Sequence, residues 1–534
     1  MTNRTYKTGA TRDQLSLLPP RIEDYVGRDN LVRAIEAYVC TLDLEKLGFR
    51  YTEAVSGSGA GQPAYHPADL LKAYLYGYLN RIRSSRGLER EARRNLELIW
   101  LLRQLTPGYR TIATFRKDNW AALKKVNRAF VLLARELNLV GGELVAIDGA
   151  FFHGDASKAS ITTRKRLAEQ LAALEREIEA YGNTLEANDA AEEAHPPAGE
   201  DGGDVAQKLA ALMAKAKEDL KRLDDSGETQ LSATDADARL LSKRGQTVAG
   251  YNVQIAVDDK HKLIVASEVV NDGNDTGQLH EMAKAAKEVL EVETLQAVAD
   301  TGYYNSAALK SCEDDGIVAY VPPAKRTGKL DKKGRFTHEA FVYDAEANAY
   351  QCPAGKLLKP MNGFKINTGG RREIRYVSLK SVCDACPLRQ RCLPDKEPRR
   401  TVYRWEHEPV IERHRARMKQ AGARMSQRAC LVEHPFGTLK CRAGYRHFLV
   451  RGFDKVRGEW SLMALCYNFA RVLNILGFDR FVAYLATRAV EPALLFVLGI
   501  VTAAISRARA LWAGNWGESG QKSATMTLCH GLAA

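Results

Sequence analysis

The stretch LVAIDG, residues 144 to 149, decides the fold, because it places an acid directly after a run of buried-strand character. Four apolar residues, two of them β-branched, favour a strand that is covered on both faces. The run ends on Asp148 and a glycine. A carboxylate at the end of a buried strand lies at the edge of a sheet, where acids from neighbouring strands can join it.

The sequence beyond this strand predicts the rest of one α/β sheet. The segment LQAVAD is a second buried strand that ends on an acid, Asp300. Two β-rich runs that flank a polar turn are typical of a hairpin. In chain order, the expected elements are a hairpin over 250–270 with its turn at 258–261, a helix over 278–290, a strand over 295–300, a helix over 305–313 and a strand over 316–323.

A helical hairpin is expected to interrupt this sheet over residues 158–232. Apolar residues at alternating steps of four and three form the seam of a coiled coil on each side of a polar tip, residues 186–204. The predicted seam residues are Leu167, Leu171, Leu174, Ile178, Tyr181 and Leu185 in the first helix, and Val205, Leu209, Leu212, Ala216, Leu220 and Leu223 in the second.

The first part of the chain, residues 14–140, is expected to be an all-α domain. The segments 66–82, 87–105 and 109–139 show helical spacing, with a turn at 107–108. Between residues 81 and 128 there are 13 Lys or Arg against 4 Asp or Glu. This pattern suits a helix-turn-helix-like DNA-binding module, with Arg116 and Lys117 as candidate contacts, and the alternative is a solvated helical bundle.

Composition supports a polyanionic partner. The 534 residues carry 78 Lys and Arg against 65 Asp and Glu, a formal net charge of +13, and nucleic acid is the commonest partner of so basic a chain. The start of the chain lacks the apolar core of a signal peptide, so a cytoplasmic protein is expected. The longest apolar run, residues 493–505, is shorter than a membrane span and is interpreted as a buried or docking helix.

Three acids are candidates for a metal site. Carboxylates are the hard oxygen ligands that Mg²⁺ prefers, and two ions held together can cleave and join phosphodiesters. Asp148 and Asp300 are placed at strand ends, and Glu433, in LVEHPFGTLK, fits as the third acid by its order in the chain. Each has an alternative role: a turn at Asp148, a helix cap at Asp300 and a surface ion pair at Glu433. A further acid, Asp275, is interpreted as a helix cap.

The cysteines between residues 326 and 420 form a second group. Four thiols lie within 41 residues, with a Cys-x₂-Cys pair at the centre, and zinc favours four thiolates of this kind. A structural zinc site is predicted, and four reduced or partly buried thiols are the alternative. The candidate ligands are Cys352, Cys383, Cys386 and Cys392.

The order of strand, acid, hairpin, strand, acid, strand, insertion and helix with Glu resembles the RNase H-like catalytic core of bacterial insertion-sequence DDE transposases. The resemblance runs from about residue 14 to 476. Eight phrases carry it in the family's order: QLSLLPPRIEDYV, HPADLLKAYLYGYL, AIDGAFFHGDASK, TDADARL, GYNVQIAVD, VADTGYYN, CPAGK and VEHPFGTLK.

The resemblance implies a two-metal DNA-cleaving enzyme. It assigns the catalytic and metal-binding triad to Asp148, Asp300 and Glu433, with two Mg²⁺ ions and Mn²⁺ as a possible substitute. It also implies that Lys440 and Arg428 contact DNA. Lys440 has the family's spacing of seven residues after the Glu, whereas Arg428 lies five residues before it instead of four, and Ser426 stands where the family has Tyr.

The same resemblance sets the expected organisation and partners. The core would comprise residues 141–325 and 421–476, with a Cys-rich insertion over 326–420 and a tail over 477–534. The expected partners are double-stranded DNA, both the element's terminal inverted repeats and the target, and further copies of the chain in the reacting complex, in a bacterial, nucleoid-associated setting and without a membrane. A catalytically silent, domesticated DNA-binding protein is the alternative, and a protein that acts through its coiled-coil hairpin is a third reading.

Overall fold

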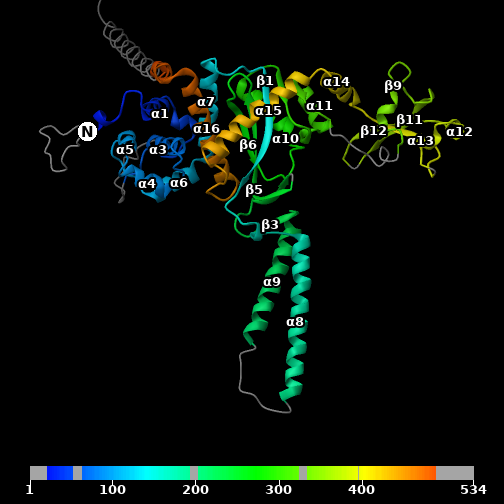
Figure 1. The fold of residues 1–534 in the computed structure, drawn as a ribbon, viewed down its shortest axis with the longest axis horizontal. Coiled ribbons are helices and arrows are strands. Elements are labelled where there is room, and N and C mark those ends of the chain that lie inside the picture. Colours follow the sequence, from blue (N-terminus) through cyan, green and yellow to red (C-terminus); the bar gives the residue numbers. More distant parts are fainter. Residues whose placement is uncertain are drawn as a thin grey trace, which may run out of the picture.

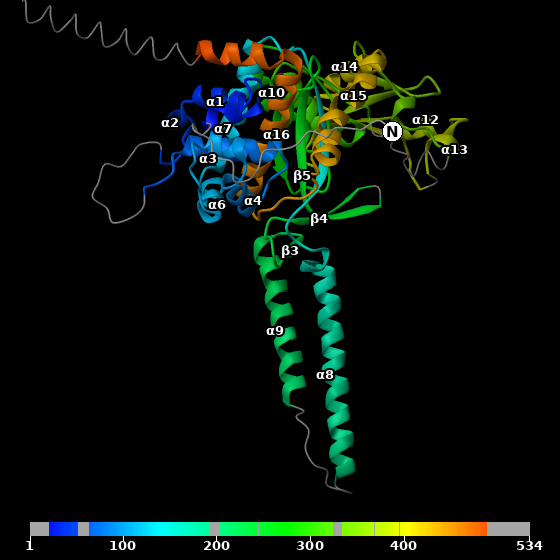
Figure 2. The same cartoon turned by 60° about the vertical axis from the view of Figure 1, so that its left-hand side comes forward.

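The structure is a computed structural model that describes residues 21–51, 63–192, 203–243, 245–323, 334–367, 369–394 and 396–488, with side chains from 184 to 206 excepted. A group of N-terminal helices packs against a central sheet, and a smaller sheet lies at the far side of that core (Figure 1). A pair of long helices projects from the core as an arm (Figures 1 and 2). The chain is therefore a mixed α/β protein with an all-α N-terminal part.

The N-terminal part is helical, as predicted, but its helices are shorter than the sequence periodicity indicates. Asn95 caps one helix by accepting bonds from two backbone N–H groups, and Asn119 donates to the carbonyl of Phe115 at another break. Both breaks fall at Asn because its side chain competes with the helix for backbone groups. The elements are η1 (Ile22–Tyr25), α1 (Leu31–Cys40), α2 (Leu44–Leu47), α3 (Pro67–Leu79), α4 (Ser85–Ala92), α5 (Leu96–Leu101), α6 (Tyr109–Asp118) and α7 (Trp120–Glu136).

The central sheet has the predicted hairpin and parallel strands. β5 pairs with β1 on one edge and with β6 and β4 on the other, all antiparallel, while β1, β7 and β8 run parallel. The strand order is therefore β6 or β4, then β5, β1, β7 and β8. The strands are β1 (Leu144–His153), β4 (Arg239–Lys243), β5 (Gln246–Asp258), β6 (Ile264–Val270), β7 (Leu295–Val298) and β8 (Ile317–Tyr320).

Helices cover both faces of this sheet. Phe152 of β1 lies 5.4 Å from the ring of Trp460 and 6.3 Å from that of Phe436, so its face carries α15 and α16. Side chains alternate between the two faces along a strand, so position 149 belongs to the other face. There Gly149 lies close to Asp275, which comes just before α10. The helices around the sheet are α10 (Gln278–Leu290), η3 (Thr301–Tyr303), α11 (Ser306–Asp314), α14 (Glu408–Met418), α15 (Gly422–Gly437), the π-helical turn η6 (Thr438–Arg442) and α16 (Phe453–Leu476).

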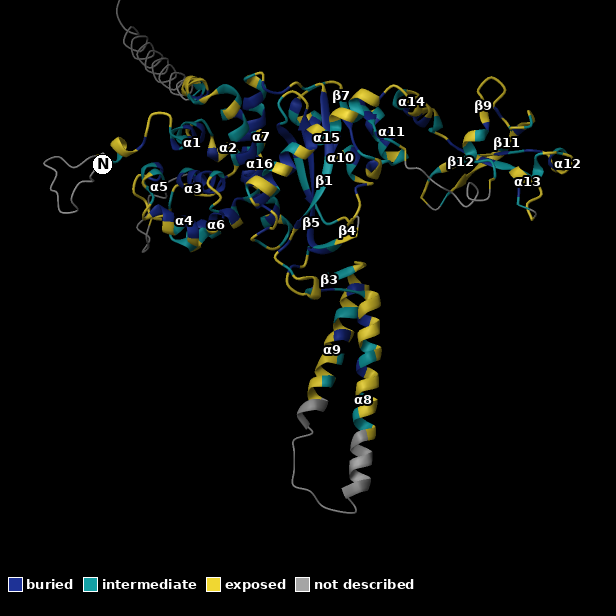
Figure 3. Cartoon of the chain, viewed as in Figure 1, coloured by how far each residue is buried: buried dark blue, intermediate teal, exposed yellow. Residues whose placement is uncertain are grey.

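The projecting arm consists of α8 (Arg164–Glu192) and α9 (Gly203–Ser226), with β2 (Ile161–Thr163), β3 (Gln230–Ser232) and η2 (Lys158–Ser160) at its base. Leu167, Ala216 and Leu223 are buried between the two helices. The prediction that Leu212 belongs to the seam is wrong, because Leu212 is 48% exposed while the adjacent Met213 is half-buried. The exposed outer faces of both helices are visible in Figure 3.

The cysteine-bearing segment forms a five-stranded antiparallel sheet with its own small core, which includes Phe341, Tyr350 and Tyr376. This core is separate from that of the central sheet. The elements are η5 (His338–Ala340), β9 (Val342–Asp344), β10 (Ala349–Gln351), β11 (Leu357–Ile366), β12 (Arg372–Val377), α12 (Lys380–Asp384), α13 (Arg389–Cys392) and β13 (Thr401–Trp405).

The end of the described chain is helical. The middle of α16 is buried, and the helix is followed by another over Phe478–Arg488, bent from it by 111°. Across the described ranges, no single helix is long and apolar enough to cross a membrane, although this bent pair meets the criteria of length and composition together. The apolar run at 493–505, predicted as a docking helix, lies outside the described residues.

Candidate active site

Two of the predicted acids meet in the central sheet. β1 and β7 pair in parallel up to Ala146 and Val298, so Asp148 and Asp300 stand at the same level, two residues past the last pair. Burial raises the pKa of Asp148, and the negative charge of Asp300 raises it further. The two carboxylates therefore lie near each other at the point where pairing between the two strands ends.

The sequence places the end of the first strand wrongly. β1 continues beyond Asp148 to His153, because β5 pairs with it over its whole length. Asp148 itself lies opposite Ile255, and its Oδ1 accepts a bond of 2.9 Å from the N–H of Gly149. The alternative of an Asp-Gly turn is therefore wrong. The acid lies at the end of the pairing with β7, not at the end of its strand.

Asp300 has a capping role as well as a place beside Asp148. Its Oδ1 accepts a 2.8 Å bond from the N–H of Gly302 and so caps η3. This is the alternative that the sequence offered for Asp300, and it holds for a short 3₁₀ turn. The second carboxylate oxygen takes no part in that bond, so a cap and a metal ligand are compatible in this residue.

Arg428 reaches the acids from α15. Its Nη1 lies 3.7 Å from Oδ2 of Asp148, and this nitrogen is buried without a hydrogen-bond partner. The guanidinium lowers the pKa of Asp148, against the effects of burial and Asp300. Arg428 thus supplies a positive charge to the acid pair in this structure.

Glu433 does not form a metal-binding group with Asp148 and Asp300 in the described parts of the chain. It lies on α15 with an exposed side chain, and its carboxylate forms no hydrogen bond or ion pair with any other residue that the structure describes. Within the described ranges, no three or more His, Cys, Asp and Glu side chains are arranged to hold a metal ion. The chemistry of Asp148 and Asp300 fits a divalent cation, but the third ligand is not in place.

Lys440 lies against the strand that carries Asp148. Its Nζ donates a 2.7 Å bond to the carbonyl of Phe151 and lies 4.4 Å from the ring centre of Phe152. Burial lowers the pKa of Lys440 to about 8, although the charge of Asp148 acts in the opposite direction. α15 continues through Pro435 to Gly437, and the π-helical turn η6 that follows directs Lys440 to the sheet.

Asp275 belongs to this site, and its interpretation as a helix cap is wrong. The cap of α10 is Gly277, and no side chain caps this helix. Instead, the buried Asp275 carboxylate accepts bonds from Asn252 and Gln254 of β5, at 2.9 and 2.7 Å, and pairs with Lys243 at 3.1 Å.

Two glycines make room for this arrangement. A Cβ at Gly149 would lie 2.7 Å from Oδ1 of Asp275, and a Cβ at Gly302 would lie 2.9 Å from Oδ1 of Asp300 and 3.8 Å from Oδ2 of Asp275. Asp275 therefore lies behind both predicted catalytic aspartates. Asn252 and Gln254, whose amides hold it, are wholly buried in β5. Two amide residues at alternate positions of an otherwise apolar strand were the sequence feature that could have indicated a polar site.

The two candidate DNA contacts of the N-terminal part are placed differently. Arg116 is buried, with its guanidinium 5.6 Å from the ring centre of Tyr74 and bonded to the Tyr78 hydroxyl. It therefore cannot reach a DNA phosphate, and that prediction is wrong. Lys117, the next residue, is exposed on α6. Its role in DNA binding stays a prediction.

The four cysteines of the smaller sheet line one narrow cavity of about 30 Å³. Cys383 comes from α12, Cys392 ends α13, and the Ser378 hydroxyl lies 2.8 Å from the Cys383 sulfur. Burial raises the pKa of the Cys392 thiol, and nearby Cys352, Cys383 and Cys386 also raise it. The thiols therefore surround a common space, although they are not arranged as a closed metal site.

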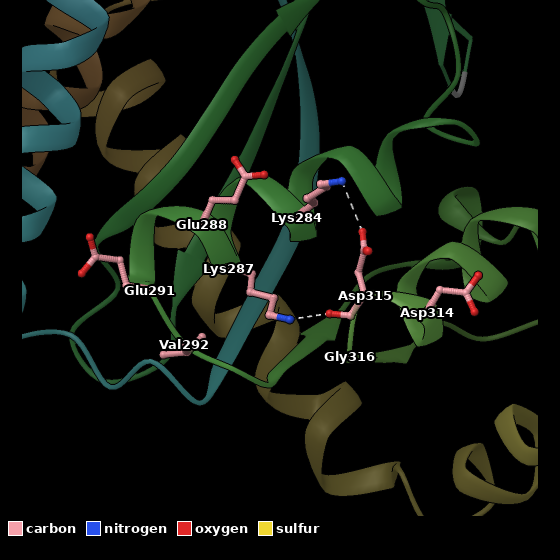
Figure 4. A pocket seen from close by; sticks show the side chains of 8 residues that line it. All are labelled: Lys284, Lys287, Glu288, Glu291, Val292, Asp314, Asp315 and Gly316. Carbon is pink, nitrogen blue, oxygen red and sulfur yellow. Dashed lines mark hydrogen bonds and ion pairs between the residues drawn. The ribbon is translucent and has the colours of Figure 1, made fainter.

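A larger pocket of about 570 Å³ lies elsewhere, between the end of α10 and the start of β8. Figure 4 shows Lys284 and Lys287 directed to Asp315, with which both interact. Its charges are thus largely satisfied within the protein. Because it lies at the opposite end of β7 from Asp300, this pocket is not part of the acid site.

Comparisons with known proteins match two separate parts of the chain. A transposase DDE domain family matches residues 351–473, and a transposase domain family of otherwise undefined role matches residues 20–118. A solved piggyBac transposase synaptic complex with hairpin DNA aligns over 86% of this chain and 81% of its own, with 8% identity and a TM-score of 0.30, which is too distant to support an argument. No curated protein matches. The two matched segments belong to transposase families, and together they indicate an insertion-sequence DDE transposase, a family of enzymes that cleave and transfer DNA with the help of divalent metal ions.

Proposed function

We propose that Asp148, Asp300 and Glu433 are the catalytic acids of this transposase and that they hold Mg²⁺, with Mn²⁺ as a substitute. The observation that carries the proposal is the pairing of Asp148 and Asp300 at one level of adjacent parallel strands. Two Mg²⁺ ions would supply charge stabilisation for the attacking and leaving oxygens of a phosphodiester. The sheet order and the hairpin before β7 support an RNase H-like core.

The protein's own residues have distinct tasks in this proposal. Asp275, held by Asn252 and Gln254, fixes the negative field behind the two aspartates. Arg428 balances the charge of Asp148 until a cation arrives. Glu433 has to approach from α15, and the π-helical turn that follows is a place where helix register can change. Lys440 and Lys117 are the proposed contacts to DNA phosphates, and Arg428 becomes available to DNA when it leaves Asp148.

The proposed substrates are the terminal inverted repeats of the element and the target DNA, with at least two copies of the chain in the reacting complex. Strand cleavage at the element end would free a 3′-hydroxyl, which then attacks the target. We further propose that the protein works in the bacterial cytoplasm at the nucleoid, where such DNA is found. The net charge of +13 supports a DNA partner.

The test is nicking of DNA that carries the repeats flanking the gene, with and without Mg²⁺. Asp148→Asn, Asp300→Asn and Glu433→Gln should each abolish nicking while gel-shift binding persists, because each removes a carboxylate charge and keeps the shape. Asp454→Asn is the matched control, an exposed acid at the start of α16, and should nick normally. Nicking by Glu433→Gln at the wild-type rate would remove Glu433 from the site.

A structural zinc in the smaller sheet is a second proposal. Its support is the common cavity of Cys352, Cys383, Cys386 and Cys392. A zinc ion would contribute folding free energy to a small sheet with a small core. Protein purified without chelators should contain about one zinc per chain, and Cys383→Ser should lose it, whereas Cys430→Ser on α15 should not. Metal analysis that finds no zinc in the wild type contradicts the proposal.

A further inference from the structure

A second cavity lies along α15, on the side of that helix that carries His434. It has a volume of about 220 Å³ and opens where the end of α3, the turn η6 and the helix α16 meet. Arg81 follows α3, Arg442 ends η6 and Arg471 lies within α16, and all three line it. We call it the arginine pocket. None of the residues that line it is acidic.

The positive charge of the arginine pocket is not neutralised within the described parts of the chain. Arg81 and Arg442 are exposed and form no ion pair with a described carboxylate. Arg471 donates to the carbonyl of His261 at 2.6 Å and lies 3.4 Å from Nε2 of His434, so its partners are neutral. Burial lowers the pKa of His434, and Arg471 and Arg442 lower it further. Three guanidinium groups therefore gather without a counter-charge, an arrangement that favours an anionic ligand.

The floor of the arginine pocket is apolar and aromatic. Met463 and Cys466 of α16 and Leu439 of η6 contribute apolar atoms. Tyr445 and Tyr467 also line it, but their hydroxyl groups already donate to the carbonyls of Tyr78 and Lys262. The floor thus consists of buried apolar and aromatic residues below an exposed, positively charged rim. At about 220 Å³ the cavity is smaller than the roughly 300–1,000 Å³ of sites for drug-sized ligands, so it suits a single small group.

We propose that the arginine pocket binds one unpaired nucleotide of the DNA substrate, with the base against the apolar floor and its phosphate at Arg81 and Arg442. Proteins that hold single-stranded nucleic acid combine these two features, an aromatic or apolar platform and a basic rim. His434 connects the pocket with the active site, because it lines the pocket and directly follows Glu433. A nucleotide held here would fix α15 at the position of the predicted catalytic acid. The proposal rests on DNA as the substrate.

The first test measures binding of three probes to the full chain by calorimetry: thymidine 5′-monophosphate, thymidine and inorganic phosphate. The monophosphate should bind more tightly than either of the other two, because only it contacts both floor and rim. Arg81→Ala with Arg442→Ala should weaken it roughly tenfold or more, since charge-assisted hydrogen bonds are lost. Arg446→Ala is the matched control, an exposed arginine of the same segment outside the pocket, and should bind normally.

The second test uses duplex DNA with 2-aminopurine at an unpaired terminal position. Its fluorescence should change when the wild type binds, and that change should be absent in the Arg81→Ala, Arg442→Ala variant although gel-shift binding of the duplex persists. Equal affinity for phosphate and the monophosphate, or an unchanged response in the double variant, would overturn the proposal. Loss of Mg²⁺-dependent nicking in the wild type would instead overturn the proposed function, so the two failures can be told apart.

Discussion

Asp148 and Asp300 are held close together although their charges repel. Burial and Asp300 both raise the pKa of Asp148, so the folded chain without metal keeps two carboxylates under electrostatic strain. Arg428 offsets only part of this repulsion, because its Nη1 lies 3.7 Å from Oδ2 of Asp148 and forms no hydrogen bond. Sites of this kind are commonly destabilising because they are arranged for a ligand.

Asp300→Asn should therefore stabilise the metal-free chain by up to about 1 kcal/mol. The repulsion of Asp148 disappears, while the amide oxygen of Asn can still accept the bond from Gly302 that caps η3. Mn²⁺ should raise the melting temperature of the wild type, because a ligand of the native state stabilises it, but not that of Asp300→Asn. Thermal unfolding in chelator and in Mn²⁺ measures both effects, with the exposed Asp155→Asn as control. Equal metal-dependent shifts in the two proteins would contradict the site.

Lys440 gives the site a pH dependence whose sign is fixed by its burial. An unfolded lysine keeps its proton up to about pH 10.4, whereas the folded Lys440 has a pKa of about 8. Between these values the unfolded chain binds more protons, so this residue makes stability rise with pH. Comparison of denaturant unfolding at pH 7.5 and 9.5 should show a smaller rise in Lys440→Met than in the wild type. A larger rise in the variant would contradict the burial of the ammonium group.

Individual elements differ in how far the sequence predicts them. The helix predicted over 278–290 is present as α10 with the same bounds. It could be predicted because apolar residues recur with helical period along the whole segment. The seam of α9 was predicted with Leu212, which lies three residues after Leu209 and four before Ala216. Met213 fits the same spacing with the two steps reversed, and the structure places Met213 inside and Leu212 outside. The end of β1 could not be predicted, since it depends on pairing with β5, a strand about 100 residues later.

The arm gives a direct test of that corrected seam. Ala216→Asp should separate α8 from α9, because it buries an unpaired charge in the contact with Leu167 and Leu223. Leu212→Asp should be tolerated, since its side chain already faces solvent. Hydrogen exchange of the arm amides distinguishes the two, and the central sheet should keep its protection in both variants. If Leu212→Asp loosened the arm as much as Ala216→Asp, the seam would be the one first predicted.

At the scale of the whole molecule, the sequence predicts the set of parts but not how they are joined. The two aspartates could be paired from strand order alone, since parallel neighbours align their ends. Glu433 could be chosen only by its place in the chain, and its distance from the aspartates depends on how α15 lies on the sheet. Arg116 was chosen for its charge, but the packing of α6 on α3 and α16 buries it. Such long-range packing leaves no local pattern in the sequence.

A buried charge network joins the N-terminal helices to the core. Glu459 of α16 is wholly buried and accepts bonds from Arg83 at 2.9 Å, from the Tyr78 hydroxyl at 3.3 Å and from the Leu449 N–H at 2.9 Å. Arg116 bonds to the same Tyr78 hydroxyl. One carboxylate thus balances two buried guanidinium groups at the junction between the two parts.

Glu459→Gln should therefore destabilise the chain by about 3–5 kcal/mol, because it leaves Arg83 and Arg116 buried without a negative charge. The loss falls at the junction, so the N-terminal helices should unfold before the central sheet and replace a single thermal transition by two. Differential scanning calorimetry, with hydrogen exchange of the amides of the N-terminal helices, measures both. The exposed Asp454→Asn, on the same helix, should leave the transition unchanged. If Glu459→Gln unfolded in one step at the wild-type temperature, this network would not hold the two parts together, and DNA bound by the N-terminal helices would have to be positioned at Asp148 and Asp300 by other contacts.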